Sequence, residues 1–385
     1  MNELEHCTEL LSRLVACPSV NPNRKPVSGP PFGEERIVSL LDYLLRSWGA
    51  KTRVEEVAPG RPNLIATFEA AKSGRSLMLE AHSDTVQVDQ MTIAPFEPAV
   101  KNGRLYGRGA CDTKGAIAAM LAAIEKVLDE DGQLPMTLHF VSCCNEELGA
   151  TGAHGLMKAG FRADFAVVGE PTDLRIVHAH KGVVRLRITT SGVAAHSSDP
   201  SRGVNAIYKM VPVLEALERK VQPELQKLNH PQLGRPTLSV GTIHGGTQVN
   251  VVPPSCAVEV DRRFVPGETR DSVVRQIVDA LRAAGDPAWE EIEYYPPLEQ
   301  DPASPIAKCV REACEEKLGK AEFVVAPWGS DAGVFSAAGI PSVLFGPGSI
   351  QQAHTQDEYV ELDQVVAASR VYAEIIRECG AAAGR

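Results

Sequence analysis

Two patterns of apolar residues alternate along the first part of the chain. Continuous apolar runs of strand length occur at Leu64–Phe68, Ser76–Ala81, Thr137–Cys143 and Phe165–Gly169. Apolar residues at helical spacing cover Glu3–Val15, Gly33–Trp48 and Lys114–Leu128. Continuous apolar strands are typical of sheets that helices cover on both faces. We therefore predict an α/β fold with a mostly parallel central sheet and helices on both faces.

The pattern changes near Lys181, where apolar and polar residues begin to alternate. Alternating strands are expected at Val183–Thr189, Thr237–Ile243 and Ala257–Val265, with helices at Asn205–Leu217 and Asp271–Ala284. This order of half-exposed strands and helices predicts a ferredoxin-like α+β unit. The first pattern then returns, with an apolar strand at Ser342–Phe345 and a helix at Leu362–Arg377. We expect a domain of residues 180–294 inserted into a larger domain of residues 1–179 and 295–385.

Composition excludes several classes of function. The net charge of -10 argues against nucleic acid or an anionic membrane as a partner, because both require a basic surface. The acidic start lacks the features of a secretory signal, and no apolar run is long enough to span a bilayer. The nine cysteines form no CxxC pair, and Cys143 and Cys144 are adjacent, which favours reduced buried thiols. We expect a cytoplasmic protein whose metals, if any, are held by histidines and carboxylates.

A histidine and an aspartate follow the predicted strand Ser76–Ala81. His82 and Asp84 are two residues apart, so both side chains can point the same way at the strand's carboxyl end. Open α/β sheets place their active sites at such ends, and a carboxylate is the usual partner that orients a metal-binding imidazole. Alone, the pair would be interpreted as a surface histidine beside a loop acid.

Acidic residues stand at three comparable positions. Asp112 lies where the glycine-rich segment 107–115 enters a predicted helix, and alone it would be interpreted as a helix N-cap. Glu146 and Glu147 follow the strand Thr137–Val141, where a solvated acidic turn is the simpler interpretation. Glu170 comes just after a third buried strand.

The shared position of these residues carries more information than any one of them. His354 follows the apolar strand Ser342–Phe345, so acids or histidines follow four predicted strands. In a parallel sheet those strand ends converge on one crevice. Several carboxylates in one crevice repel one another unless a cation neutralises them. Two histidines and three carboxylates without thiolates suit zinc, cobalt or manganese.

Together these motifs resemble a family that contains acetylornithine deacetylase, succinyl-diaminopimelate desuccinylase, aminoacylase and glutamate carboxypeptidase. The resemblance covers nearly the whole chain and implies a fold like that of zinc aminopeptidases, with two divalent metals, Zn²⁺ or else Co²⁺. It implies that Asp112 bridges the metals, that Asp84 orients His82 and that Glu146 is the general base. The remaining ligands implied are His82 and Glu170 for one metal, and Glu147 and His354 for the other. Ser83 stands where threonine is more usual.

The inserted domain matches the same family. The segment around His196 resembles one whose histidine reaches the active site of a partner subunit and helps to hold the oxyanion, which implies a homodimer. The alternative is a turn histidine before a helix. Asn250, Arg263 and Ser330 resemble substrate-binding positions, and an arginine fork suits a substrate carboxylate. Arg262 is the alternative to Arg263 for that role.

The resemblance implies hydrolysis of the amide bond of a small N-acyl amino acid. Glu170 at its position favours deacylases over aminopeptidases, and the segments 180–182, 196–207, 242–246 and 346–359 are most similar to acetylornithine deacetylases. We therefore expect N-acetyl-L-ornithine or a similar N-acetyl amino acid as substrate, and a place in arginine biosynthesis. The alternatives are an N-succinyl-diaminopimelate desuccinylase, a metal-dependent peptidase of the glutamate carboxypeptidase type, a non-catalytic binding protein on the same fold, and a zinc-stabilised structural module.

Overall fold

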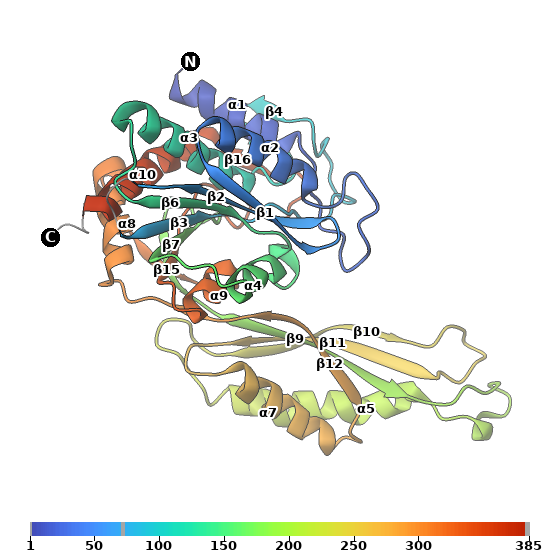
Figure 1. Cartoon of the computed structure of the whole chain (residues 1–385). Helices are drawn as coiled ribbons and strands as arrows, with labels where there is room; N and C mark the ends of the chain where they lie inside the picture. The colour runs from blue at the N-terminus through green and yellow to red at the C-terminus, as the bar shows by residue number, and fades with distance from the viewer. Residues whose placement is uncertain (1, 71–73, 382–385) are drawn as a thin grey trace. The chain divides into compact units, whose positions relative to one another are not determined.

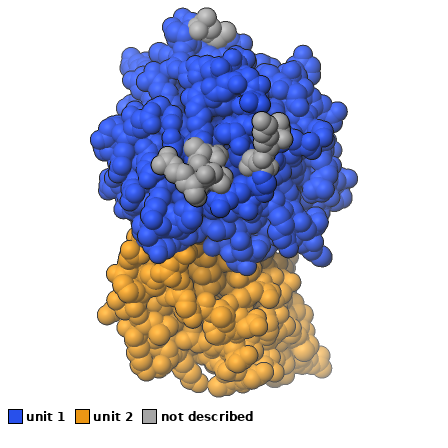
Figure 2. Space-filling model, turned by 60° about the vertical axis from the view of Figure 1, so that its left-hand side comes forward, with its two compact units in different colours: residues 1–179, 300–324, 330–385 blue, residues 180–299, 325–329 orange. Residues whose placement is uncertain are grey.

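The computed structural model describes residues 2–70 and 74–381, and the chain forms two compact units (Figure 2). Unit 1 comprises residues 1–179, 300–324 and 330–385, and unit 2 comprises residues 180–299 and 325–329. Unit 2 thus ends its main segment at residue 299 rather than at 294. A boundary at 294 would cut strand β12 (Ala288–Tyr295). This strand pairs with β9 (Gly182–Ser191) and so belongs to unit 2.

The large sheet crosses unit 1 in the strand order β1-β2-β6-β3-β7-β15-β8. Its strands are β1 (Lys51–Ala58), β2 (Arg61–Phe68), β3 (Ser76–Glu80), β6 (Thr137–Ser142), β7 (Phe165–Val168), β8 (Ile176–His180) and β15 (Ser342–Leu344). The central strands β6, β3, β7 and β15 are parallel, which confirms the mostly parallel sheet, whereas β1, β2 and β8 pair antiparallel with their neighbours. The carboxyl ends of the four parallel strands therefore share one edge.

Helices cover both faces of this sheet (Figure 1). The helices of unit 1 are α1 (Glu3–Val15), α2 (Glu35–Ser47), α3 (Lys114–Asp131), α4 (Thr151–Lys158), α8 (Pro305–Leu318), α9 (Asp331–Ala337) and α10 (Leu362–Ala381). Helices α1, α3 and α10 pack against one another on one face, and α4 and α9 lie on the other. Alanines let α3 lie close to the sheet, and it ends at Gly132, whose φ of 69° suits a residue without a side chain.

The rest of unit 1 contains a small sheet in the order β16-β5-β4, formed by β4 (Ala99–Lys101), β5 (Arg104–Tyr106) and β16 (Tyr359–Glu361). Its short strands bring the segment after His354 beside the loop that precedes Asp112. Strand β14 (Phe323–Ala326) pairs with β8. The sequence pattern did not predict these strands, because three or four residues are too few to show a period.

Unit 2 is a four-stranded sheet in the order β10-β11-β9-β12, with α5 (Ala206–Ala216) and α7 (Arg270–Arg282) on one face (Figure 1). Strands β10 (Thr237–Gly245) and β11 (Ser255–Phe264) pair antiparallel, and β11 and β12 both pair antiparallel with β9. This is the strand order of a ferredoxin-like unit. Short helical turns continue α5 to α6 (Gln222–Leu225), and β13 (Leu298–Glu299) ends the main segment.

Two further observations bear on the sequence predictions. Cys309 and Cys379 form a disulfide between α8 and α10, so the expectation of reduced thiols is wrong for this pair; the other seven cysteines are free. The two partners are far apart in sequence, and helical periodicity gave no sign that they meet. None of the helices within residues 2–70 and 74–381 combines the length and apolar character needed to cross a membrane.

Candidate metal centre

The first group of ligand atoms lies at the carboxyl ends of β3 and β7. His82 follows β3, Glu170 follows β7, and Asp112 stands two residues before α3. The Nε2 atom of His82 is 3.0 Å from Oδ1 of Asp112. One potential ligand atom from each of these three residues lies within 4.8 Å of the others, and all three side chains are buried. Side chains from three remote segments therefore converge in one small space.

The second group shares Asp112 with the first. Nε2 of His354 is 3.2 Å from Oδ2 of Asp112 and 3.1 Å from Oε2 of Glu147. Because Oδ1 of Asp112 faces His82 while Oδ2 faces His354, the two oxygens of one carboxylate serve two different groups. A carboxylate in this position can bridge two cations. His354 is the exposed member, and its φ of 63° places it in the left-handed region.

The electrostatics of the two groups show that positive charge is needed here. Burial raises the pKa values of Glu146, Glu147 and Glu170 above the ordinary range, and neighbouring carboxylates raise them further. Hydrogen bonds to Asp112 and Glu147 raise the pKa of His354 to about 11. Burial alone would lower the pKa of His82, but contact with Asp112 and the charge of Glu146 raise it well above its usual value. Divalent cations would supply the positive charge that this group of carboxylates requires.

The donor set fits two divalent cations of the zinc type. It consists of imidazole nitrogens and carboxylate oxygens, and no thiol belongs to either group among the residues that the structure describes. Zn²⁺ binds such ligands, and a site with three protein ligands keeps a position open for water or substrate. The residues that would hold one cation are His82, Asp112 and Glu170, and those for the other are Asp112, Glu147 and His354.

Glu146 lies beside these groups without being a member of either. Its side chain is buried, and its Oε2 is 3.9 Å from Nε2 of His82. The backbone nitrogens of Glu146 and Glu147 donate to the carboxylate of Asp84, at 2.9 and 3.3 Å. The same backbone turn thus directs two adjacent acids to different positions.

Asp84 contacts His82 mainly through its backbone. The carbonyl oxygen of Asp84 is 3.0 Å from Nδ1 of His82, whereas its nearest carboxylate oxygen is 3.7 Å away. A carbonyl acceptor on Nδ1 leaves Nε2 of a neutral imidazole available to a metal. The Asp84 carboxylate, in turn, holds the turn that carries Glu146 and Glu147.

A network of buried polar residues supports this turn, and sequence reasoning missed it. Nδ2 of Asn21 donates to Asp84 and to Asn145 at 2.7 and 2.8 Å. Arg61 donates to Asn145 at 3.0 Å and forms a bidentate pair with Glu34 at 2.5 Å. These residues lie in loops or inside apolar segments, where single polar residues follow no period.

Glu358 was also missed, and it holds the loop that carries Asp112. Its carboxylate is fully buried and accepts from the backbone nitrogens of Gly109, Cys111 and Asp112 at 2.9–3.0 Å. Arg108 completes its coordination at 2.7 Å. These four hydrogen-bond donors on one carboxylate fix the backbone of the loop that leads to Asp112 and includes it. A lone acid four residues after a histidine gives no sequence signal for such a role.

We expect Glu358→Gln to lower the affinity of the centre for Zn²⁺ by about 10- to 100-fold, the usual effect of removing a residue that orients a ligand. The amide would point a donor at backbone donors and leave Arg108 without a buried counter-charge. Competition with a chromophoric chelator measures the affinity.

Glu361→Gln is the matched control for this change, because Glu361 is a partly exposed acid of the same segment that pairs with Arg104 at 2.7 Å. Circular dichroism of both variants checks that they are folded. An unchanged affinity in folded Glu358→Gln would contradict the assigned role.

Comparison with known proteins agrees with the geometry. The sequence model of peptidase family M20/M25/M40 matches residues 78–378 of the chain. This range contains all six residues of the centre and includes unit 2. The chain belongs to this family. It is therefore a hydrolase of a metallopeptidase and amidohydrolase family.

Relatives within the M20 family differ in their named activities. The chain is 32% identical over 358 residues to acetylornithine deacetylase of Vibrio cholerae, which covers 90% of this chain and 92% of that one. An M20 metallo-carboxypeptidase from Sulfolobus solfataricus has the same fold, with a TM-score of 0.81, 20% identity and coverage of 99% and 100%. A dinuclear metal binding M20 peptidase from Bacillus subtilis gives a TM-score of 0.67, 18% identity and 97% coverage of both chains.

The candidate substrate residues of this M20 chain lie mostly in unit 2. His196 and Asn250 are both exposed, and the backbone nitrogen of Ser197 donates to the Asn250 carbonyl at 3.0 Å. The guanidinium of Arg263 is partly exposed and pairs with Asp261 at 2.7 Å. Ser330, in unit 1, is buried and caps α9 by accepting from a backbone nitrogen.

Arg262 differs sharply from its neighbour. Its side chain has no exposed surface, and it donates to Glu268 at 2.5 Å and to the carbonyl of Arg263. A guanidinium enclosed in this way stabilises unit 2 and is not presented to solvent. Adjacent residues on β11 point to opposite faces of the sheet, which accounts for the contrast.

Proposed function

We propose that the chain hydrolyses the amide bond of N-acetyl-L-ornithine, or of a similar N-acetyl amino acid, to acetate and the free amine, with two Zn²⁺ ions as cofactors and Co²⁺ as a competent substitute. The observation that carries the proposal is the carboxylate of Asp112, whose two oxygens face two separate ligand groups beside the buried Glu146. The relatives named acetylornithine deacetylase support the substrate.

In the proposed reaction the cations and the side chains of the protein have different roles. When bound, paired divalent metals polarise a carbonyl and lower the pKa of a water. Glu146 accepts the proton of the attacking water and delivers it to the leaving amine. Its burial keeps bulk water away, and the Asp84 contact to its backbone fixes its position. Asp84 thus acts by positioning both His82 and Glu146.

Arg263 is the proposed contact for the substrate carboxylate, because its guanidinium is partly exposed while that of Arg262 is enclosed. Asn250 and Ser330 are also proposed as substrate-binding residues. The pairing of Arg263 with Asp261 holds its fork in one orientation and leaves donor capacity for an anion.

His196 is proposed to hold the oxyanion in the active site of a second copy of the chain. The backbone nitrogen of Ser198 donates to its Nδ1 at 3.2 Å, so Nδ1 acts as an acceptor. Nε2 is then the ring nitrogen left to donate a hydrogen bond, and an oxyanion requires such a donor. Exposed apolar side chains on α5 and around β10 support a homodimer through unit 2; they include Tyr208, Val211, Ile243 and Val249.

Mixing two inactive variants tests this arrangement. His196→Ala and Glu146→Ala homodimers should each be inactive, whereas subunit exchange should restore about one quarter of wild-type activity. Half of the dimers would then be mixed, and one of their two sites would receive both intact residues. No recovery in a mixture with demonstrated exchange would place His196 and Glu146 in the same chain's site and exclude action across the dimer.

Substrate choice is tested by comparing kcat/KM for three substrates with the Zn²⁺- and Co²⁺-loaded protein. N-acetyl-L-ornithine should be hydrolysed best, ahead of N-succinyl-diaminopimelate and of a dipeptide. A preference for the succinyl substrate or the peptide would replace the deacetylase proposal by one of these alternatives. The dipeptide is included because a tripeptidase and a metallo-carboxypeptidase have the same fold as this chain.

A further inference from the structure

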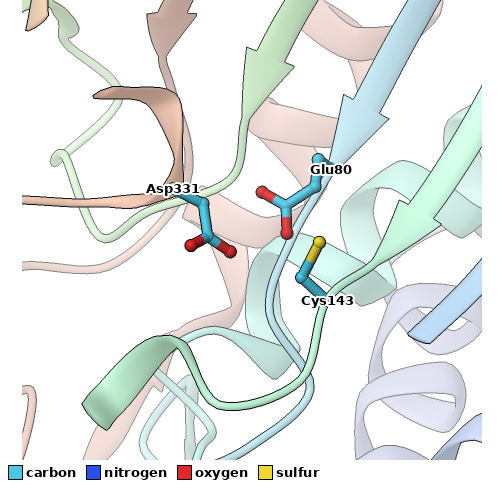
Figure 3. Close-up of side chains that lie close together, drawn as sticks. All are labelled: Glu80, Cys143 and Asp331. Carbon is cyan, nitrogen blue, oxygen red and sulfur yellow. The ribbon is translucent and has the colours of Figure 1, made fainter. Parts of the chain in front are cut away.

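A third cluster of potential ligands lies within unit 1, separate from the two groups that contain Asp112. Glu80 is the last residue of β3, Cys143 follows β6, and Asp331 is the first residue of α9. Figure 3 shows the carboxylates of Glu80 and Asp331 directed toward each other, with the sulfur of Cys143 beside Glu80. One ligand atom from each of the three residues lies within 4.8 Å of the others.

The cluster is closed to solvent and receives no hydrogen bond from residues outside it within the described part of the chain. The exposed fractions are 0% for Glu80, 0% for Cys143 and 1% for Asp331. In the part of the chain that the structure describes, no residue outside the cluster donates a hydrogen bond to any of the four buried carboxylate oxygens, so Glu80 and Asp331 can interact only with each other and with Cys143. Natural proteins rarely bury carboxylates in this way, because an unpaired charge or lone pair in a low dielectric is costly.

Two compensating species could occupy such a cluster: a proton or a cation. A carboxylic acid bound to a carboxylate places their oxygens in a short, aligned hydrogen bond. One proton shared between Glu80 and Asp331 would satisfy a single oxygen of each acid, and their other oxygens would stay buried without a donor from outside the cluster. One cation can instead contact an oxygen of each acid and the thiolate of Cys143 at the same time. Burial and the charge of Glu80 raise the pKa of Asp331 well above its usual value, as expected when two acids meet without a counter-charge.

We infer that Glu80, Cys143 and Asp331 form a third cation site, which takes a divalent metal of the zinc and cobalt type. A thiolate with two carboxylates selects against the hard cations Mg²⁺ and Ca²⁺ and suits borderline metals. The site ties β3, β6 and α9 together. Because Ser330 directly precedes Asp331, the cation also fixes the start of α9, where a substrate residue is proposed.

The thiolate makes the third site distinguishable from the other two. The Asp112 groups contain only nitrogen and oxygen donors, so Co²⁺ bound there gives weak ligand-field absorption alone. Co²⁺ bound to a thiolate adds intense near-ultraviolet charge-transfer absorption. Titration of the metal-free full-length chain with Co²⁺ should therefore saturate at three equivalents per chain, one of which develops the charge-transfer band.

Cys143→Ser should abolish that band, while the matched control Cys144→Ser should retain it. Cys144 is an equally buried, adjacent thiol whose Sγ contacts the carbonyl of Arg61 instead. Glu80→Gln and Asp331→Asn, which keep shape and remove charge, should each lower Co²⁺ binding by one equivalent and leave the ligand-field bands of the other two.

Saturation at two equivalents without a thiolate band would overturn the inference, and so would a band that persists in Cys143→Ser. The inference does not depend on the proposed deacetylase function. A thiolate band in a protein that fails to hydrolyse any N-acyl amino acid would support the third site while contradicting the function.

Discussion

Glu146→Gln is expected to lower kcat by ~10²–10⁴-fold, the usual contribution of a general base, while both metals stay bound. Glu146 lies next to His82 but belongs to neither ligand group. The amide keeps the size of the side chain and the backbone contact to Asp84, yet it cannot accept a proton. Steady-state kinetics together with metal analysis by mass spectrometry separates loss of chemistry from loss of metal.

Glu147→Gln is the matched control, since it alters the adjacent acid on the same turn. Glu147 contacts His354 at 3.1 Å and belongs to the second ligand group. Its loss should reduce metal content, and added Zn²⁺ should restore part of the activity. If Glu146→Gln instead lost its metal and recovered with added Zn²⁺, Glu146 would be a ligand and another residue would be the base.

Asp112→Asn should have the broadest effect on metal binding of any single change in the centre. We expect Zn²⁺ affinity of both groups to fall and activity to drop by more than about 100-fold, beyond the effect of losing a merely orienting residue. The reason is that each oxygen of this carboxylate faces a different histidine. Retained Zn²⁺ after dialysis and kcat/KM at saturating Zn²⁺ are the measurements.

Glu170→Gln provides the comparison for Asp112→Asn, because Glu170 belongs to the first group alone. The two variants differ in whether one or both groups are affected. Equal metal loss in Asp112→Asn and Glu170→Gln would contradict a bridging carboxylate. Both changes preserve side-chain shape, so differences in folding do not dominate the comparison.

Much of the fold could be predicted because its central strands are continuous apolar runs. The buried strands β3, β6, β7 and β15 were located this way, and helical spacing of apolar residues located α1 and α3. Strands β1 and β12 were missed because most of their residues are polar or exposed, so neither shows a continuous apolar run or a regular alternation. Helix α8 was missed because its Pro305 start follows a loop rich in proline and acids. In these elements the local pattern of apolar and polar residues does not reflect which side chains the folded protein buries.

More of the candidate metal ligands could be predicted from the sequence than of the residues that hold them in place. Residues that follow buried strands are visible as acids or histidines after apolar runs, and the structure brings all five candidate ligands together in two groups. The supporting residues Asn21, Arg61 and Glu358 are single polar positions in irregular segments. Glu80 was also missed, although a charged residue inside the apolar run Leu77–Ala81 could have drawn attention to it.

The order of the ligands along the chain has a consequence for how the centre is assembled during translation. The first group is complete once residue 170 has been made, but the second requires residue 354. All of the main segment of unit 2 is synthesised in between, and β15, which lies beside β7, also comes afterwards. A ribosome-bound chain stalled before residue 342 therefore lacks β15 beside β7 and has only one complete ligand set, so we expect metal loading to occur in two separable stages.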